Sequence, residues 1–348
     1  MAAVRSIQDL FGFGGFISHA IRHPLDFQSS VGRSLNELTA GILGSSFNPD
    51  RDLPNLAGKV ILVTGGNTGL GKETIVQLAK HKPSRIYLAA RTASKARDAI
   101  AVIHASLPTV DIRYIPLDLT SFASIRAAAT QFQADCDRLD ILILNAGTLG
   151  NPPGLTDEGY EIHMGTNHIG HFLLTELLLP TLRATCYNSG SHSPPDVRVV
   201  TLSSLACQSA PSYDVMTSTP ALMTHGWLTR YGASKAANVL FAAELARRYP
   251  EILSVSVHPG AVASDLYEHT RNASFLGGLG LSIMFSFSRS VRTGALTQIW
   301  AAGVPRGELV NGGYYVPIGV KGVSQYEDDV QMGRAFWEWT EREIARHS

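Results

Sequence analysis

Tyr231 and Lys235 are the residues whose types and spacing most directly point to chemistry. They stand four residues apart in Y-G-A-S-K, at the start of a helical pattern that runs from 231 to 248. Four residues is about one helical turn, so both side chains are expected on the same helix face. A neighbouring cation lowers the pKa of a phenol from its ordinary value of about 10. The pair is therefore a candidate acid/base device, although surface pairs often share this spacing.

A glycine-rich turn follows the first buried apolar run of the chain. Residues 60–63 are continuously apolar, as expected for a strand that is buried on both faces of a parallel sheet. The turn T-G-G-N-T-G-L-G comes next and leads into a helical pattern over 70–81. Backbone amides and the dipole at such a helix start suit a phosphate group. We expect the turn to bind a dinucleotide, the alternative being a packing turn; its binding residues would be Gly65, Asn67, Gly69, Leu70 and Gly71.

Short apolar runs alternate with helical patterns over most of the chain. The predicted strands cover 60–63, 85–90, 112–117, 141–144, 197–202, 253–257 and 314–317. The predicted helices include 70–81, 93–106, 121–135 and 231–248. This alternation predicts an α/β fold, namely a single doubly wound Rossmann-type domain with a seven-stranded parallel sheet and helices on both faces.

Polar or glycine residues follow the predicted strands, at the sheet edge where doubly wound proteins bind ligands. Arg91 follows the second strand, where a cation suits the 2′-phosphate of NADP(H), although an ordinary surface arginine is the alternative. Asp118 follows the third strand as a candidate partner of adenine, and Asn145 opens N-A-G after the fourth, beside a ribose. Either residue could instead form a turn or a cap.

Three further stretches carry candidate residues. Asn167 lies within N-H-I-G-H-F, where an asparagine is more often structural than catalytic. The fifth strand ends in Ser203 and Ser204, and the sixth in H-P-G-A-V-A-S, which includes Val262 and Ser264. Hydroxyl groups at strand ends commonly form caps and turns. Six successive strand ends with such residues favour a shared binding site instead.

In this order, the motifs resemble those of the short-chain dehydrogenase/reductase family over roughly 56–319. The match rests on T-G-G-N-T-G-L-G at 64, L-D-L at 117, N-A-G at 145, N-H-I-G-H-F at 167, S-S at 203, Y-G-A-S-K at 231 and H-P-G-A-V at 258. N-H-I-G-H-F and S-K-A-A-N-V-L-F look most like the retinol dehydrogenase and protochlorophyllide reductase branch. N-G-G-Y-Y-V-P-I-G looks like its fungal members, many of which modify secondary metabolites.

The resemblance implies a role for each candidate residue. Tyr231 would exchange a proton with a substrate carbonyl or alcohol, while Lys235 would lower its pKa and hold the nicotinamide ribose. Ser204 would donate to the carbonyl oxygen, and Asn167 would anchor a water that relays protons to Lys235. Val262 and Ser264 would contact the nicotinamide end of the cofactor. Three positions depart from the common family pattern, namely Gly66 for alanine, Leu144 for asparagine and Ser264 for threonine.

Composition narrows the remaining functions. Lys+Arg and Asp+Glu are equal at 29 each and no basic run occurs, so a nucleic-acid partner is not expected. Three scattered cysteines favour a reducing compartment, and no metal-ligand spacing is present. Two apolar stretches, 10–21 and 273–287, are too short or too glycine-rich for a spanning helix. We expect a cytoplasmic protein, with peripheral membrane contact as the minority alternative.

Residues 1–55 are expected to form an N-terminal extension, 56–320 the dinucleotide-binding domain and 321–348 a helical tail. A substrate lid is expected near 265–290, where apolar residues predict a fairly apolar substrate. The leading hypothesis is an NADP(H)-dependent carbonyl reductase or alcohol dehydrogenase that acts on a small molecule. The alternative is a non-catalytic dinucleotide-binding scaffold or redox sensor. The family resemblance also implies a homo-oligomer as one further expectation.

Overall fold

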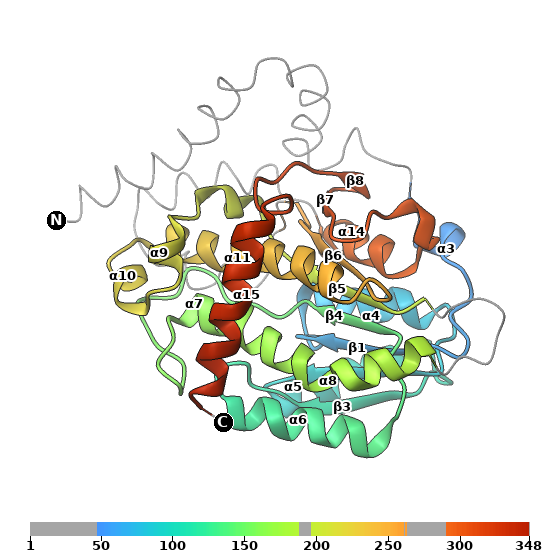
Figure 1. Ribbon diagram of the computed structural model, residues 1–348. Helices are drawn as coiled ribbons and strands as arrows, with labels where there is room; N and C mark the ends of the chain where they lie inside the picture. Colours follow the sequence, from blue (N-terminus) through green and yellow to red (C-terminus); the bar gives the residue numbers. More distant parts are fainter. Residues whose placement is uncertain (1–46, 188–195, 261, 263–289, 348) are drawn as a thin grey trace.

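The computed structural model describes residues 47–187, 196–260, 262 and 290–347, which are built around one sheet (Figure 1). The predictions for most of the N-terminal extension, the two apolar stretches, Ser264 and the lid up to residue 289 fall outside the described residues. No helix in the described ranges is long and apolar enough to cross a membrane.

The sheet has eight strands in the order β3-β2-β1-β4-β5-β6-β7-β8. All neighbours are parallel except β7 and β8. The strands are β1 (Val60–Thr64), β2 (Arg85–Ala90), β3 (Ile112–Pro116), β4 (Ile141–Leu144), β5 (Arg198–Leu202), β6 (Leu253–Val257), β7 (Tyr314–Val316) and β8 (Val320–Lys321). The doubly wound α/β fold and its seven parallel strands are confirmed. The prediction omitted β8, because a two-residue strand that returns through Gly319 (φ +67°) is too short to show periodicity.

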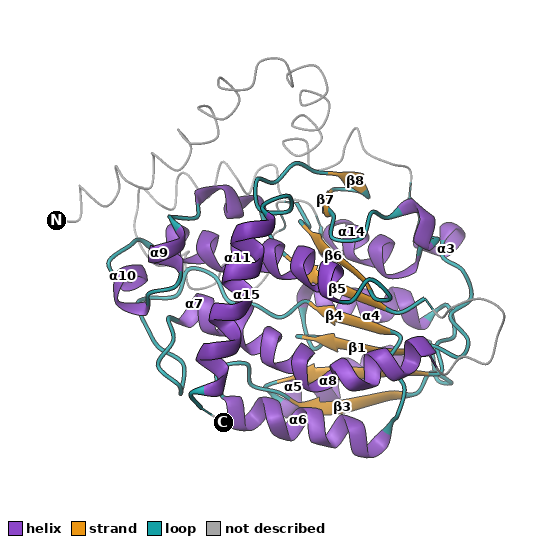
Figure 2. Ribbon diagram, in the orientation of Figure 1, coloured by secondary structure: helices purple, strands orange, loops and turns teal. Residues whose placement is uncertain are grey.

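Helices cover both faces of the sheet (Figure 2). The longer helices are α4 (Gly69–Ala79), α5 (Ala93–Ser106), α6 (Phe122–Asp135), α8 (Gly170–Tyr187), α11 (Trp227–Arg248), α14 (Val291–Gly303) and α15 (Val330–Ala345). The short ones are α3 (Pro49–Asp52), α7 (Ile162–Met164), α9 (Tyr213–Met216), α10 (Thr219–Met223), a π-helix η1 (Gly165–Ile169) and the 3-10 helices η2 (Leu205–Ser209) and η4 (Arg306–Glu308). The helix predicted over 70–81 ends at Ala79, because the chain turns through Lys82 at φ +57°.

Alternate side chains of the central strands point into two separate apolar cores, one on each face of the sheet. Ile61 and Val63 face the core formed with α4, α5 and α14, whereas Leu62 faces the core formed with α6, α8, α11 and α15. Both faces of β1 are therefore buried, which explains its continuous apolar sequence. The order of the strands reverses between β1 and β4, so the crevice at their carboxyl ends is the expected ligand site.

The predicted C-terminal tail packs into the second core. Trp337 of α15 stacks on Phe241 of α11 with ring centroids 5.7 Å apart, and it meets Phe172 of α8 edge-on at 4.6 Å. Every residue of α11 from Arg230 to Ala246 is buried. The helix that carries Tyr231 and Lys235 is thus buried along most of its length.

Candidate active site

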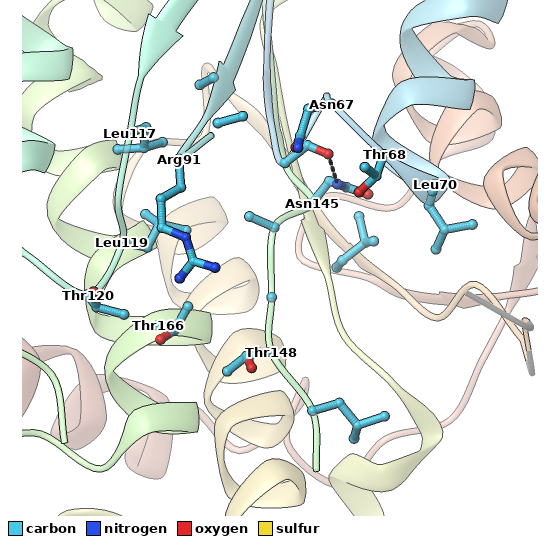
Figure 3. A pocket seen from close by; sticks show the side chains of 18 of the residues that line it. Asn67, Thr68, Leu70, Arg91, Leu117, Leu119, Thr120, Asn145, Thr148 and Thr166 are labelled. Atoms are coloured by element: carbon cyan, nitrogen blue, oxygen red, sulfur yellow. Dashed lines mark hydrogen bonds between the residues drawn. The ribbon is translucent and has the colours of Figure 1, made fainter. Parts of the chain in front are cut away.

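A cavity of about 540 Å³ lies along the carboxyl ends of β1, β2, β4 and β5 (Figure 3). This volume is within the usual range for cofactor and small-molecule sites. Most of the predicted cofactor residues line it, namely Gly65, Asn67, Gly69, Leu70, Arg91, Asp118, Asn145, Tyr231 and Lys235. Within the described residues, no group of three or more His, Cys, Asp or Glu side chains has the arrangement of a metal site.

The glycine turn needs its glycines at three positions. Gly65 and Gly69 have φ values of +66° and +52°, which residues with a Cβ rarely adopt. A Cβ on Gly71 would lie 2.3 Å from the carbonyl oxygen of Gly65. The turn therefore folds back tightly on the start of α4. No side chain caps the helix at Thr68 and no acidic residue lies in its first turn, so its amides suit a phosphate group.

The structure also explains why Gly66 replaces the more usual alanine. A Cβ at this position would lie 2.5 Å from Ile75 Cδ1 and 2.9 Å from Leu88 Cγ. These two large side chains already fill the space beneath the turn. An alanine at this position would therefore require Ile75 and Leu88 to move.

Asn145 holds the glycine turn by its side chain. Its Nδ2 donates to the carbonyl oxygens of Thr64 at 2.8 Å and Gly65 at 3.4 Å. Gln298 of α14 supports this contact by donating to Asn145 Oδ1 at 3.2 Å and to the Leu70 carbonyl at 3.4 Å. The sequence prediction omitted Gln298, because it lies more than 150 residues from its partners and no local pattern marks it.

Arg91 extends into the cavity from the end of β2 (Figure 3). Among the described residues, its guanidinium forms no hydrogen bond and no ion pair. Lys95, in the first turn of α5, lines the same end of the cavity and is exposed. The prediction did not include Lys95, although it lies four residues after Arg91, at the start of the helix predicted over 93–106. The two cations together suit a phosphate better than either does alone.

Asp118 lines the cavity and also forms a local turn. Its Oδ1 accepts from the Thr120 amide at 3.0 Å and from Thr120 Oγ1 at 2.7 Å, while its own amide donates to Ser124 Oγ. Its Oδ2 accepts no hydrogen bond from the described residues. The turn that the sequence left as an alternative is therefore present, and one carboxylate oxygen remains for a ligand.

Tyr231 and Lys235 lie on one face of α11, as predicted, and both line the cavity. Lys235 Nζ is 5.5 Å from the centre of the Tyr231 ring and donates to the Leu202 carbonyl at 2.9 Å. The side chain of Lys235 is almost fully buried, and burial lowers its pKa from 10.5 to about 7. The ammonium is therefore held where a negative partner or a bound hydroxyl would stabilise it.

The two serines at the end of β5 have different roles. Ser203 is buried and donates to the Lys235 carbonyl at 2.7 Å, which ties the strand to α11. Ser204 caps η2 by accepting from the Ala206 amide at 3.2 Å, and its own proton has no acceptor among the described residues. Ser203 lines the described cavity and Ser204 does not. The bonding pattern nevertheless favours Ser204 as the serine with a free proton.

Asn167 lies in η1, a π-helical turn of a kind often found at functional sites. Its amide is held from three sides: Oδ1 accepts from the Thr148 amide at 2.7 Å, and Nδ2 donates to the Thr148 carbonyl at 3.1 Å and to Ser234 Oγ at 2.9 Å. The side chain of Asn167 is thus structural and does not line the cavity. Its main-chain carbonyl accepts from His171 Nδ1 at 3.0 Å.

His171 connects this carbonyl to the ends of β1 and β4. Because its Nδ1 donates to a carbonyl, we assign the proton there, and Nε2 then accepts from Thr64 Oγ1 at 2.9 Å. Thr64 Oγ1 in turn accepts from the Ala146 amide. Burial lowers the pKa of His171 to about 4, which keeps it neutral in this chain of hydrogen bonds.

Val262, a predicted cofactor residue, is buried against Gly294 of α14, and it does not line the described cavity.

Comparisons with known proteins agree with this arrangement. The family model for short chain dehydrogenases matches residues 59–213. A short-chain dehydrogenase/reductase of Armillaria gallica is 38% identical over 296 residues, which cover 83% of this chain and 91% of that protein. The chain belongs to the short-chain dehydrogenase/reductase family.

Other similar proteins include human retinol dehydrogenase 11, which is 36% identical over 285 residues, or 81% of this chain and 85% of that protein. The crystallised NADP complex of RhlG from Pseudomonas aeruginosa has a TM-score of 0.56 and 29% identity, and covers 76% of this chain and 96% of that one. The chain is thus an oxidoreductase of a family whose typical cofactor is NAD(P). The tight glycine turn, the uncapped start of α4 and the cations at the end of β2 fit such a dinucleotide.

Proposed function

We propose that this short-chain dehydrogenase/reductase is an NADP(H)-dependent carbonyl reductase or alcohol dehydrogenase that acts on a fairly apolar small molecule. The observation that carries the proposal is the common cavity of Tyr231, Lys235 and the glycine turn. A phenol beside a buried ammonium is an acid/base group, and the turn is a phosphate site. The cofactor, when bound, supplies or accepts the hydride.

The residues of the chain account for proton transfer. Tyr231 donates its phenolic proton to the carbonyl oxygen during reduction and accepts a proton during oxidation. Lys235 favours the phenolate by its charge, and Ser204 donates a hydrogen bond to the same substrate oxygen. The main-chain carbonyl of Asn167 holds the water that carries protons to Lys235.

Burial of Lys235 matters for the strength of this arrangement. Lowering the pKa of a tyrosine from about 10 to near 7 requires about 4 kcal/mol. An exposed ion pair contributes no more than about 1 kcal/mol. A charge inside an enclosed site acts through a lower effective dielectric and is screened less by salt. The enclosed position of Lys235 therefore strengthens the effect of its ammonium on the Tyr231 phenol, while the same burial lowers the pKa of Lys235 to about 7.

Two observations support an apolar substrate. The apolar residues Leu149, Ile162 and Pro259 line the same cavity as Tyr231. Human retinol dehydrogenase 11, to which the chain is similar, is named for an apolar alcohol. The run N-G-G-Y-Y-V-P-I-G, which resembles fungal members of the family, adds secondary metabolites to the candidate substrates.

Arg91 and Lys95 support NADP(H) as the cofactor instead of NAD(H). We expect Arg91→Ala to reduce the preference for NADPH over NADH roughly 10-fold to 100-fold, the effect of losing a charge-assisted hydrogen bond. The measurement is the dissociation constant of each reduced cofactor by fluorescence titration. Arg97→Ala is the matched control, because Arg97 is exposed on α5 and does not line the cavity. An unchanged preference in Arg91→Ala would show that Arg91 does not read the phosphate.

The direct test of the proposed activity is stoichiometry. Purified protein is incubated with NADPH and one carbonyl compound at a time. The compounds are an aromatic ketone, a long-chain aldehyde and all-trans-retinal. One NADPH consumed for each alcohol formed is the expected result. The alternative function, a non-catalytic scaffold or redox sensor, predicts NADPH binding without alcohol formation for every carbonyl compound, including activated diketones.

Two proposals about partners follow from the packing and the composition. An oligomer that paired through α11 would have to displace α15, so we propose that any self-association uses another face. Light scattering of the full chain measures whether it self-associates at all. Peripheral membrane contact stays a prediction, and liposome co-sedimentation with and without residues 1–46 tests it.

A further inference from the structure

A cluster of three buried ionisable side chains lies beside Tyr231 and has no part in the roles described so far. Glu161, His163 and Arg230 are each no more than 2% exposed. Glu161 Oε1 accepts from His163 Nδ1 at 2.7 Å and from Arg230 Nη1 at 2.8 Å. Its other oxygen, Oε2, accepts from the amides of His163 and Met164 at the start of α7. One carboxylate thus bonds a cation, an imidazole and a helix terminus.

The cluster joins three segments that form the wall of the cavity. Arg230 directly precedes Tyr231 on α11, and its Nη2 donates to the carbonyl of Asn151, a residue that lines the cavity. Glu161 and His163 belong to the segment that continues into η1, where Thr166 lines the cavity. The relative positions of these segments therefore depend on the bonds to Glu161.

His163 carries this constraint to the Tyr231 ring. The two rings meet edge-on, with centroids 6.2 Å apart and an interplanar angle of 75°. Such a geometry favours one orientation of both rings. Because His163 Nδ1 faces a carboxylate, we assign a proton to it. His163 Nε2 is buried and has no hydrogen-bond partner among the described residues. Among the described residues, the bond from Nδ1 to Glu161 is therefore the one side-chain hydrogen bond that orients the His163 ring.

The energetics favour a role in positioning over one in stability. Burying a carboxylate and a guanidinium costs several kcal/mol per ion before their attraction is counted, and apolar residues of similar volume often give equal or greater stability. Arg230 Nε is also buried, and it has no hydrogen-bond partner in the part of the chain that the structure describes. A cluster that stabilises the fold so inefficiently, and that touches the proposed acid/base, is better explained by the orientation it imposes.

We propose that Glu161, His163 and Arg230 are positioning residues that fix the orientation of the Tyr231 phenol. This inference rests on the proposed function, in which Tyr231 exchanges the proton. Glu161 holds the other two side chains by hydrogen bonds. Arg230 connects the start of α11 to Asn151 in the cavity wall, and His163 restricts the Tyr231 ring. None of the three touches the reacting atoms.

Four variants separate positioning from stability. Glu161→Gln removes the charge at equal volume. His163→Phe keeps a ring against Tyr231 but loses the bond to Glu161, whereas His163→Asn keeps a donor at the place of Nδ1 and loses the ring. Asp140→Asn is the matched control, because Asp140 is a fully buried carboxylate bonded to two cations at the opposite edge of the sheet.

The kinetic measurement uses NADPH with phenanthrenequinone, an activated diketone, as the probe. A misplaced reacting group costs up to about 100-fold, so we expect kcat to fall roughly 10-fold to 100-fold in Glu161→Gln and in both His163 variants. The KM for NADPH should stay within about twofold, since no cofactor contact changes. The solvent isotope effect on kcat should rise, because proton transfer becomes slower. Asp140→Asn should lower the melting temperature without these changes.

A second measurement does not depend on any substrate. With 3-fluorotyrosine at position 231 and NADP⁺ present, the parent and Asp140→Asn should give one narrow ¹⁹F resonance. His163→Phe and His163→Asn should give a broadened resonance or two of them. Unchanged resonances in the His163 variants would overturn the inference. So would losses of kcat in the Glu161 and His163 variants that are no larger than the loss in Asp140→Asn, when the melting temperatures of the variants are equally lowered. If Tyr231→Phe keeps full activity, the proposed function itself is wrong, and that result is distinct from a failure of the cluster alone.

Discussion

Replacing Lys235 by Met should make the protein without cofactor more stable near neutral pH. The side chain of Lys235 is 4% exposed, and its only hydrogen bond among the described residues goes to the Leu202 carbonyl. Met has a similar length and no charge. Leu202 keeps a donor in the variant, because Asn238 Nδ2 also donates to its carbonyl at 2.9 Å. The substitution therefore removes a desolvated ammonium and leaves no buried acceptor unpaired.

The magnitude follows from the pKa of Lys235. A fall from 10.5 to about 7 corresponds to about 5 kcal/mol at roughly 1.4 kcal/mol per pH unit, as an upper bound. The lost hydrogen bond offsets about 1 kcal/mol. The folded-state pKa lies below the unfolded one, so between about pH 7 and 10.5 the unfolded chain binds more protons. The free energy of unfolding of the parent therefore rises with pH in this window, and the destabilisation by Lys235 is complete below pH 7.

Urea denaturation from pH 6 to pH 10.5 measures this difference. We expect Lys235→Met to be more stable than the parent by about 2–4 kcal/mol at pH 6, and the difference to vanish towards pH 10.5. Lys95→Met is the matched control, because Lys95 is exposed and should show no such trend. A Lys235→Met variant that is less stable than the parent at pH 6, or a difference independent of pH, would refute the reasoning.

Two further predictions concern the glycine turn and the C-terminal helix. Gly71→Ala should weaken NADPH binding at least about tenfold in fluorescence titrations, because the new Cβ would displace the Gly65 backbone, whereas Gly307→Ala has open space and should bind normally. Trp337→Ala should lower the free energy of unfolding by about 3–5 kcal/mol in urea titrations, because the Trp337 ring is buried between Phe172 and Phe241. A loss below about 1 kcal/mol would mean that α15 contributes little to the core.

The parts of the fold and site that follow from the sequence are those written in local patterns. The apolar run over 60–63 and the glycines after it predicted β1, the turn and the start of α4, because strand burial and positive φ values each restrict residue type locally. The spacing of Tyr231 and Lys235 predicted their common face. Asp118 and Asn145 were also found, and the turn that was the alternative for Asp118 is present. The bonds from Asn145 to the Thr64 and Gly65 carbonyls were not predicted.

What could not be predicted depends on contacts between distant segments. Gln298 of α14 donates a hydrogen bond to Asn145, which follows β4. Arg230 of α11 donates one to Glu161, which precedes α7. Neither pair has a sequence spacing that would distinguish it from ordinary polar residues. The different roles of Ser203 and Ser204 likewise arise from the position of the Lys235 carbonyl, which only the packed helix defines.

The central claim is that Tyr231 transfers the proton while the cofactor transfers the hydride. A single-turnover experiment with C4-deuterated NADPH and a carbonyl compound that the parent reduces tests it most directly. The account predicts deuterium at the carbinol carbon in the parent, and at least about a 100-fold slower rate in Tyr231→Phe with unchanged NADPH affinity. A rate in Tyr231→Phe within a few fold of the parent would contradict the account.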